Sequence, residues 1–511
     1  MATKYERYPT VSISKTVSVY PKIIHPQKVL NLSNLDRQCP TLMYLVFFYD
    51  NPNLLSCDGY KSCNDLSLNS VFNSLKSGLE ETLSMWYPAA GRLSLNPNDG
   101  KLNLWCNNKG AVLVEATSQV KISDLGDLTQ YNEFYEKLVF KPDFDGNDFP
   151  RMPLVVGQVT KFGCGGYSIG IGTSHSLFDG PSAYSFLSAW ASNSAINAKQ
   201  NTHDHHLLLI KPVHERATLL TLGNYNSQSG VNNSLLISKI DQHVITAANN
   251  SNRNNQYDMP HMKARGSVGA AAIDHLLQLL IQASTTTGGN IASSSNIFNQ
   301  KYCSFVFKTF HLSSSLIENL KREVFKDGGF SCSSFEVLAA LLWKARTKAM
   351  GLRKEAMVCL QFAVDTRNKV APPLPAGFSG NAYVLASVAL AAGELERISH
   401  KAIVEKIRQA KDSVNNDYVK SYMEGVQGPQ QASLPPLKEL TLVSDWTRMP
   451  FHNINFFSSR ATHVSPLVPP IPQIAYFMQN PNDDRAVDVR IGLLPDSLDA
   501  FCSYFLAAIA Q

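Results

Sequence analysis

The sequence of 511 residues lacks long apolar runs and a strong excess of charge of either sign. No window approaches the roughly 18 uninterrupted apolar residues that span a bilayer, so we expect no integral membrane segment. Lys and Arg outnumber Asp and Glu by only 46 to 41, for a net charge of +5, and no concentrated basic stripe is present. This balance argues against a nucleic-acid partner.

Paired cysteines are also lacking. Nine cysteines are scattered along the chain without a Cys-x-x-Cys pair, as is typical of reduced thiols in a cytosolic protein. Residues 1–7 carry no apolar stretch behind their charges, so we expect no signal peptide. We therefore predict a globular protein in the cytoplasm.

Apolar residues are plentiful, at 44% hydrophobic and 10% aromatic, which is enough for sizeable cores. Residues 1–222 and 301–511 each mix strand-length apolar runs with stretches of helical periodicity. We predict two α/β domains of one architecture, with a ligand site in the cleft between them. Residues 223–300 contain polar tracts around a predicted helix at 270–283, and we interpret them as a linker or insertion.

The expected elements follow from apolar periodicity and from capping and turn residues, with Ser333 or Ser334 as one helix cap. They are strands at 41–49, 111–115, 167–174, 306–310, 357–364, 382–391, 440–445 and 486–493, and helices at 70–87, from 180 onward, at 334–346 and at 402–415.

The sharpest local motif is Thr173-Ser-His175-Ser-Leu-Phe-Asp179-Gly-Pro181. A histidine leaves a buried strand here, an aspartate follows four residues later, and a Gly-Pro turn begins a helix. Histidine, with an ordinary pKa of about 6.5, is largely neutral at pH 7 and can accept a proton. The serines that flank His175 do not complete a nucleophile-elbow pattern, which disfavours a serine hydrolase.

Six further stretches accompany this motif along the chain. They are LSNLD at 32–36, WYPAAGRL at 86–93, SFEVLAALLW at 334–343, VDTR at 364–367, GFSGN at 377–381 and SDWTRMPF at 444–451. On these residues the chain resembles, nearly end to end, the BAHD family of plant acyl-CoA-dependent acyltransferases. Residues 126–136, 165–172 and 434–440 look like its branch of brassinosteroid-related acyltransferases.

The resemblance implies two mixed-sheet domains like chloramphenicol acetyltransferase, with a channel between them. It implies acyl transfer from acyl-CoA, as a co-substrate, to a hydroxyl of a small molecule, with a brassinosteroid or related sterol as the first-choice acceptor. His175 would take the hydroxyl proton and return it to the leaving sulfur, so neither a covalent acyl-enzyme nor a permanently bound cofactor or metal is expected. The polar connector 203–206, although rich in histidine, is not interpreted as a metal site. A monomer is expected.

The resemblance also implies roles for the other site residues. Asp179 would support the structure by pairing with Arg367, while Ser444 and Trp446 would donate hydrogen bonds to the developing oxyanion. Ser379 and Asn381 would help to hold CoA. Packing of Trp446 in the core, and a purely structural turn at Ser379 and Asn381, remain open as alternatives.

One family motif is degraded, because the usual DFGWG sequence falls on residues 455–459 and keeps only one Phe. In the family this motif is away from the reacting centre, so its loss should change a turn more than the chemistry. Two alternatives stay open: acylation of a phenolic or alkaloid acceptor, and a non-catalytic relative that assists lipid elongation. An apolar acceptor would also allow a peripheral location at the endoplasmic reticulum.

Overall fold

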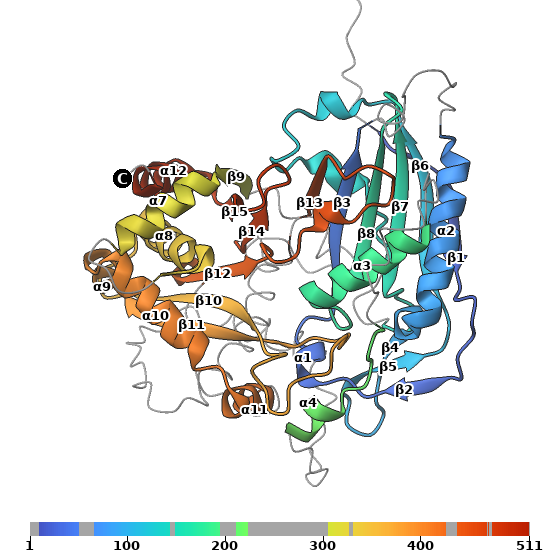
Figure 1. The fold of residues 1–511 in the computed structure, drawn as a ribbon, viewed down its shortest axis with the longest axis horizontal. Helices are drawn as coiled ribbons and strands as arrows, with labels where there is room; N and C mark the ends of the chain where they lie inside the picture. Colours follow the sequence, from blue (N-terminus) through green and yellow to red (C-terminus); the bar gives the residue numbers. More distant parts are fainter. Residues whose placement is uncertain are drawn as a thin grey trace, which may run out of the picture.

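In the part of the chain that this computed structural model describes, the strands form three sheets, two of six strands and one of three. The structure describes residues 10–50, 66–143, 149–194, 211–222, 305–325, 331–425, 437–467, 469 and 473–509. The two large sheets lie in separate halves, on the right and on the left in Figure 1. Each half buries its own apolar core, which confirms the predicted α/β fold with two mixed sheets.

The first large sheet has the order β1–β6–β7–β8–β3–β13, in which only β6 and β7 are parallel. Its strands are β1 (Ser12–Val19), β6 (Ala111–Ser118), β7 (Val155–Phe162), β8 (Tyr167–Ser174), β3 (Leu42–Tyr49) and β13 (His463–Pro466). Helices α2 (Leu68–Met85) and α3 (Gly180–Ser194) lie together against this sheet (Figure 1). The apolar face of α2 that the helical spacing predicted is buried, from Val71 to Leu83.

The second large sheet has the order β11–β10–β12–β14–β15–β9, with β10, β12 and β14 running parallel. Its strands are β11 (Tyr383–Ala391), β10 (Met357–Asp365), β12 (Leu440–Asp445), β14 (Ala475–Gln479), β15 (Val487–Leu493) and β9 (Val306–Leu312). Its core includes the apolar residues of α8 (Ser334–Ala349), α10 (His400–Asp412) and α12 (Pro495–Ile509). Ser333 caps α8 with a full capping box, as one of the two serines was expected to do.

The remaining described elements are short. They are the small sheet of β2 (Lys28–Leu30), β5 (Leu102–Cys106) and β4 (Arg92–Leu95), the helices α1 (Asn34–Arg37), α4 (Ala217–Leu222), α7 (Ser314–Val324), α9 (Ala392–Arg397) and α11 (Asn416–Gly425), and the 3-10 turns η2 (Tyr87–Ala90), η3 (Ile122–Leu125), η4 (Glu133–Lys137), η7 (Leu437–Glu439) and η8 (Phe451–Asn453). Among all described helices, none is long and apolar enough to cross a membrane.

The strands and helices predicted from the sequence are confirmed, with boundaries that shift by a few residues. The predicted helix at 270–283 lies outside the described residues. The domain boundaries at 222 and 301 stay a prediction, but one strand crosses between the halves. β13 belongs to residues 301–511, yet it pairs with β3 of the first sheet, with Val464 opposite Phe47.

The degraded motif at 455–459 leads into this crossing strand. Phe456 and Phe457 are buried in the core of the first half, where Phe456 makes an edge-on ring contact with Trp190 at 5.5 Å and Phe457 lies 4.7 Å from the ring of Tyr49. The two phenylalanines therefore anchor the segment that carries β13 to β3, which is a structural role.

We expect Phe456→Ala to lower the free energy of unfolding by about 3–5 kcal/mol, because it removes a fully buried ring. The matched control Ser458→Ala, two residues away and exposed, should change it by less than about 0.5 kcal/mol. Urea denaturation followed by tryptophan fluorescence measures both values. Equal stability of the two variants would contradict the anchoring role.

Candidate active site

His175 emerges directly from the end of β8. Every residue of β8 is buried, and the His175 N–H continues the pairing with the first sheet by donating to the Thr41 carbonyl at 2.8 Å. Glycine lets the strand pack this closely, since a Cβ at Gly170 would lie 2.0 Å from the Leu138 carbonyl oxygen. The backbone of His175 is thus fixed, while its ring remains half-buried rather than enclosed.

Asn381, just before β11 of the second half, determines which ring nitrogen of His175 carries the proton. Its side-chain NH₂ group faces two pure acceptors, the Asp36 carboxylate at 3.1 Å and the His175 carbonyl at 2.7 Å. The amide oxygen of Asn381 must therefore face His175 Nδ1, at 3.2 Å, and an amide oxygen can only accept. A neutral His175 accordingly carries its proton on Nδ1 and leaves Nε2 as the base.

The electrostatics keep this ring neutral. Burial lowers the pKa of His175 below its ordinary value of 6.5, although hydrogen bonding and the charges of Asp179 and Asp36 act in the opposite direction. A lowered pKa means that the base-competent neutral form persists to a lower pH than in a free histidine.

Asp36, the last residue of the LSNLD stretch, is a fully buried carboxylate that holds Asn381 in place. It accepts from the Asn381 backbone N–H at 2.9 Å and from Ser33, and it pairs with the fully buried Arg216, whose Nε lies 3.2 Å away. Burial alone would raise the pKa of Asp36, but Arg216 and the hydrogen bonds hold it below the usual range. The carboxylate therefore stays charged beside the site.

Asp179 forms the ion pair with Arg367 that the resemblance implied. The contact is bidentate, with N–O distances of 2.8 and 2.9 Å, and the Asp179 side chain is almost completely buried. Asp179 also accepts from the backbone N–H groups of Ser182, at the start of α3, and of Ala382. All four contacts are internal, so the carboxylate joins α3 of the first half to the second half.

The Asp36–Arg216 and Asp179–Arg367 pairs both hydrogen-bond to the backbone of one short segment, residues 379–382. The carboxylates accept the N–H groups of Asn381 and Ala382, while Arg216 donates to the Ser379 carbonyl at 3.2 Å and Arg367 to the Gly380 carbonyl at 3.0 Å. Gly380 is required for this approach, because a Cβ there would lie 2.6 Å from the Arg216 guanidinium. The segment that carries Asn381 is thus held from both sides.

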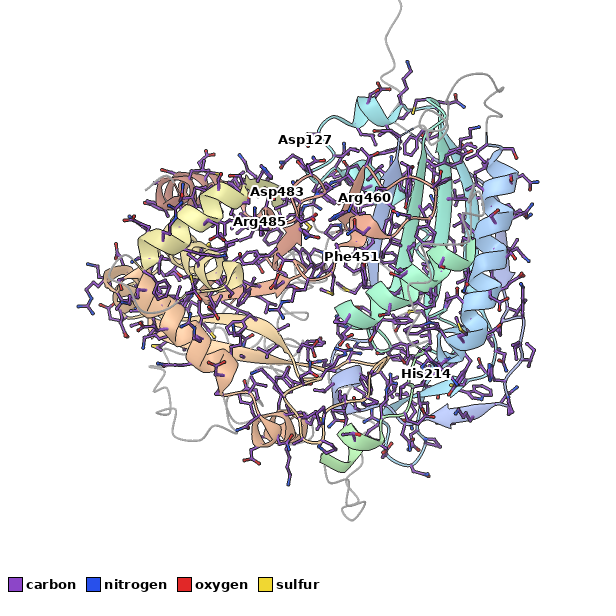
Figure 2. All side chains as sticks on the ribbon, viewed as in Figure 1. Asp127, His214, Phe451, Arg460, Asp483 and Arg485 are labelled. Carbon is purple, nitrogen blue, oxygen red and sulfur yellow. The ribbon has the colours of Figure 1, made fainter. Side chains whose placement is uncertain are left out.

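Ser379 lies within the same buried network. Its hydroxyl contacts His214 Nδ1 at 2.6 Å and the Val213 carbonyl at 3.2 Å, and both Ser379 and His214 are buried. His214 lies on the first half beside the small sheet (Figure 2). The contacts of Ser379 and Asn381 among the described residues are all internal, and the expected role in holding CoA stays a prediction.

Ser444 and Trp446 lie at the end of β12. The indole N–H of Trp446 donates to the Ser444 hydroxyl at 3.0 Å. The indole is therefore occupied, while the Ser444 hydroxyl hydrogen remains available to another acceptor. The parallel strands β10 and β12 end at the same edge of the second sheet, where β11 begins, so Ser444 and Asn381 share that edge.

No group of three His, Cys, Asp or Glu side chains suited to a metal ion occurs within the described part of the chain. The histidine-rich connector at 203–206 lies outside the described residues.

The roles of two residues in this site were not predicted from the sequence. Asp36 was recognised only as part of a motif, and Arg216 was not recognised at all. Their side chains are adjacent only in space, 180 positions apart in the sequence. The available signal was a serine three residues before the aspartate, which is the spacing of a capping box.

Comparisons with known proteins agree with this fold. The profile of the Transferase family matches residues 10–507. Brassinosteroid-related acyltransferase 1 of Arabidopsis thaliana is 50% identical over 97% of this chain and 98% of its own length, and omega-hydroxypalmitate O-feruloyl transferase of the same plant is 26% identical over 93% and 88%. Among solved structures, vinorine synthase superposes with a TM-score of 0.65 at 18% identity, covering 98% of both chains.

Removal of one partner of a buried ion pair leaves the other charge unpaired. We expect Asp179→Ala to lower the free energy of unfolding by about 3–5 kcal/mol for this reason. Asp365→Ala is the matched control, since Asp365 also contacts Arg367, at 3.4 Å, but is half exposed, and it should cost less than about 1 kcal/mol. Chemical denaturation at pH 7 compares the free energies of unfolding of the two variants. An Asp179→Ala protein as stable as the control would refute the stabilising role of the Asp179–Arg367 pair.

Proposed function

The chain belongs to the BAHD transferase family and is an acyl-CoA-dependent acyltransferase, and from this premise we propose that it acylates a hydroxyl of a brassinosteroid or related sterol. The similarity that supports this acceptor is the 50% identity, over nearly the whole of both chains, to a protein named as a brassinosteroid-related acyltransferase. A relative at 26% identity is named for acyl transfer to a hydroxy fatty acid, so the family fold alone does not define the acceptor.

The observation that supports the chemistry is the hydrogen bond between His175 Nδ1 and the Asn381 amide oxygen, 3.2 Å long. In the proposed mechanism His175 Nε2 removes the proton of the acceptor hydroxyl as its oxygen attacks the thioester carbon. The carbon–sulfur bond then breaks, and the imidazolium returns the proton to the CoA sulfur. The products are an ester and free CoA thiol, and His175 is neutral again.

The charge that develops on the thioester oxygen needs a hydrogen-bond donor. We propose that the Ser444 hydroxyl is this donor and that Trp446 orients it, since the indole N–H is already directed at the Ser444 oxygen. Asn381 is proposed as a positioning residue, which acts through His175, and the Asp179–Arg367 pair as structural support. We propose that the protein is a monomer in the cytoplasm. If its acceptor is apolar, the protein would also bind peripherally at the surface of the endoplasmic reticulum.

Loss of the base should abolish acceptor-dependent release of CoA thiol. We expect His175→Ala to reduce the rate by about 10²- to 10⁴-fold with a steroid acceptor. His400→Ala, at the first position of α10, is the control and should retain the wild-type rate. The measurement is thiol release from a panel of acyl-CoAs, with and without steroid. Thiol release at the same rate with and without steroid would contradict a steroid acceptor. No thiol release from folded wild-type protein would favour a non-catalytic relative.

The pH profile of kcat/KM should carry the signature of a base with a lowered pKa. Because burial lowers the pKa of His175, the rate should hold as the pH falls past the ordinary histidine value and drop only at a lower pH. Initial rates measured between about pH 4.5 and pH 8, at constant ionic strength, would locate the midpoint of this fall in rate. A midpoint at or above the ordinary value would contradict the assignment.

Asn381→Ala separates positioning of the base from contact with CoA. Loss of the hydrogen bond to His175 should lower kcat by about 10- to 100-fold and leave KM for acyl-CoA nearly unchanged. Steady-state kinetics with acyl-CoA varied at saturating acceptor distinguishes the two roles. A variant with normal kcat and a raised KM for acyl-CoA would assign Asn381 to the co-substrate instead.

A further inference from the structure

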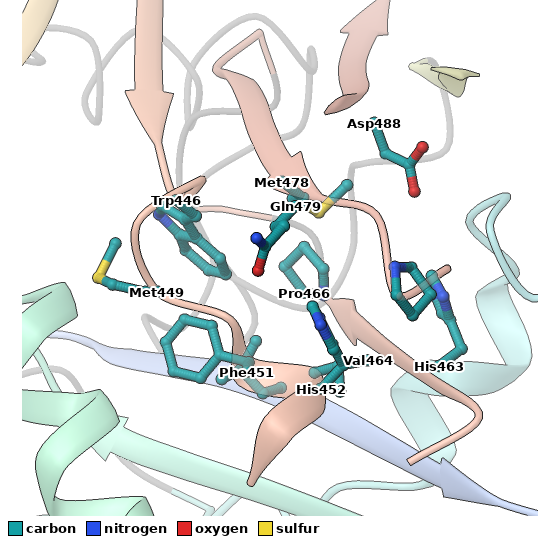
Figure 3. Close-up of a pocket in the computed structure, with 12 residues that line it drawn as sticks. Trp446, Met449, Phe451, His452, His463, Val464, Pro466, Met478, Gln479 and Asp488 are labelled. Atoms are coloured by element: carbon teal, nitrogen blue, oxygen red, sulfur yellow. The ribbon is translucent and has the colours of Figure 1, made fainter. Parts of the chain in front are cut away.

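A pocket opens where the second sheet meets β3 and β13 of the first. The space between its lining atoms amounts to about 440 Å³ when the adjoining open solvent is included, and the room that admits a water-sized group is a small part of it. Figure 3 shows its apolar and polar ends. The lining residues are Leu45, Trp446, Met449, Phe451, His452, His463, Val464, Pro466, Met478, Gln479, Pro481 and Asp488.

Three polar atoms at this pocket have no hydrogen-bond partner among the described residues. They are Nε2 of His452, Nε2 of His463 and the side-chain oxygen of Gln479. His452 is 4% exposed and His463 is 6% exposed. Buried polar groups normally find a partner, because an unsatisfied one costs free energy. Three such atoms around one pocket indicate that a ligand or ordered water supplies the missing partners.

The chemistry of the lining calls for a group that both donates and accepts a hydrogen bond, as a hydroxyl or a water molecule does. Burial, reinforced by the Arg490 charge, lowers the pKa of His463 to about 3, and burial likewise lowers that of His452, so both rings are neutral at pH 7. A neutral imidazole offers one donor and one acceptor, whereas the Gln479 oxygen only accepts. A hydroxyl can satisfy both kinds of atom.

A charged ligand fits this pocket poorly. The described lining contains no Lys or Arg, and it contains the Asp488 carboxylate, so the phosphates of CoA would find no partner here. At the other end Trp446, Met449 and Phe451 present an apolar surface (Figure 3). The pocket therefore suits an uncharged, largely apolar molecule that carries a hydroxyl.

The pocket lies along the edge of the second sheet that also carries Asn381, the hydrogen-bond partner of the base. β11, which follows Asn381, and β14, which ends at Gln479, are three strands apart in the second sheet, or about 14 Å. Along β3, Thr41 lies opposite His175 and Leu45 lines the pocket, a separation of four residues or about 14 Å. Both estimates are backbone separations, and each places the pocket about 14 Å from the strand position beside the base.

We propose that this pocket binds the end of the acceptor remote from the reacting hydroxyl, and that His452, His463 and Gln479 recognise a second hydroxyl at that end. The inference rests on the proposed function, because it takes the acceptor to be a steroid that reaches His175. It goes beyond that function by assigning acceptor selectivity to residues 452, 463 and 479, on the far side of the pocket from the base.

The test uses three probes: a brassinosteroid with hydroxyls at both ends of the skeleton, and two analogues that each lack the hydroxyls at one end. Binding to the full chain is measured by calorimetry without acyl-CoA, and acyl transfer with it. The variants are His452→Phe and His463→Phe, which keep a ring of similar size. The control is His400→Phe, whose position lies outside the pocket lining.

Wild-type protein should bind the fully hydroxylated steroid more tightly than the analogue that lacks the hydroxyls at the end bound in the pocket. Each pocket variant should weaken binding of the full steroid by about 5- to 30-fold, leave that analogue unchanged, and so erase the difference between them. The His400→Phe control should behave like wild type.

Equal weakening of all three steroids, or no weakening, would overturn the proposal and show that water fills the pocket. A raised KM for acyl-CoA alone would overturn it in favour of the co-substrate. Selective binding without any thiol release would keep the pocket and refute the proposed function. Acyl transfer by variants that keep the wild-type preference among the three steroids would support the proposed function and refute the role of the pocket.

Discussion

The structure around His175 depends on two buried carboxylate–arginine pairs that hold one short segment of the second half. Asp36 and Asp179, from the first half, accept the backbone N–H groups of Asn381 and Ala382, and the paired arginines donate to the carbonyls of the two preceding residues. Buried charges are costly unless they are paired and hydrogen-bonded, and here nearly every polar atom has a partner. The arrangement fixes Asn381 and, through it, the proton on His175.

A second junction joins the halves at the far end of the same interface. Arg490 of β15 donates to Ser465 and Pro466 of β13, and to the Thr129 carbonyl of the first half. Gln130 adds a pair of hydrogen bonds to the backbone of Thr309. The base therefore lies at one junction and the pocket of His452 and His463 beside the other, so the proposed acceptor would contact both halves.

Much of the fold could be predicted from the sequence because its central elements carry strong local patterns. The strand at 41–49 is a continuous run of strand formers, the strand at 167–174 alternates large and small residues, and the face of α2 repeats at helical spacing. β13 could not be predicted, since four residues that end in a proline give no periodic signal and the pairing with β3 spans more than 400 positions. The exit of His175 from a strand was visible in the sequence. Its hydrogen bond to Asn381 was not, because partners 206 positions apart are brought together only by the packing of the two halves.

The protonation of one ring tests this account most directly. Nitrogen NMR of protein labelled with ¹⁵N-histidine, at pH 7, reports which nitrogen of each neutral imidazole carries hydrogen, and the His175→Ala protein identifies the signals of His175 by their absence. The account predicts a protonated Nδ1 and an unprotonated Nε2 for His175. A signal from protonated Nε2, or from a charged imidazolium, would contradict it.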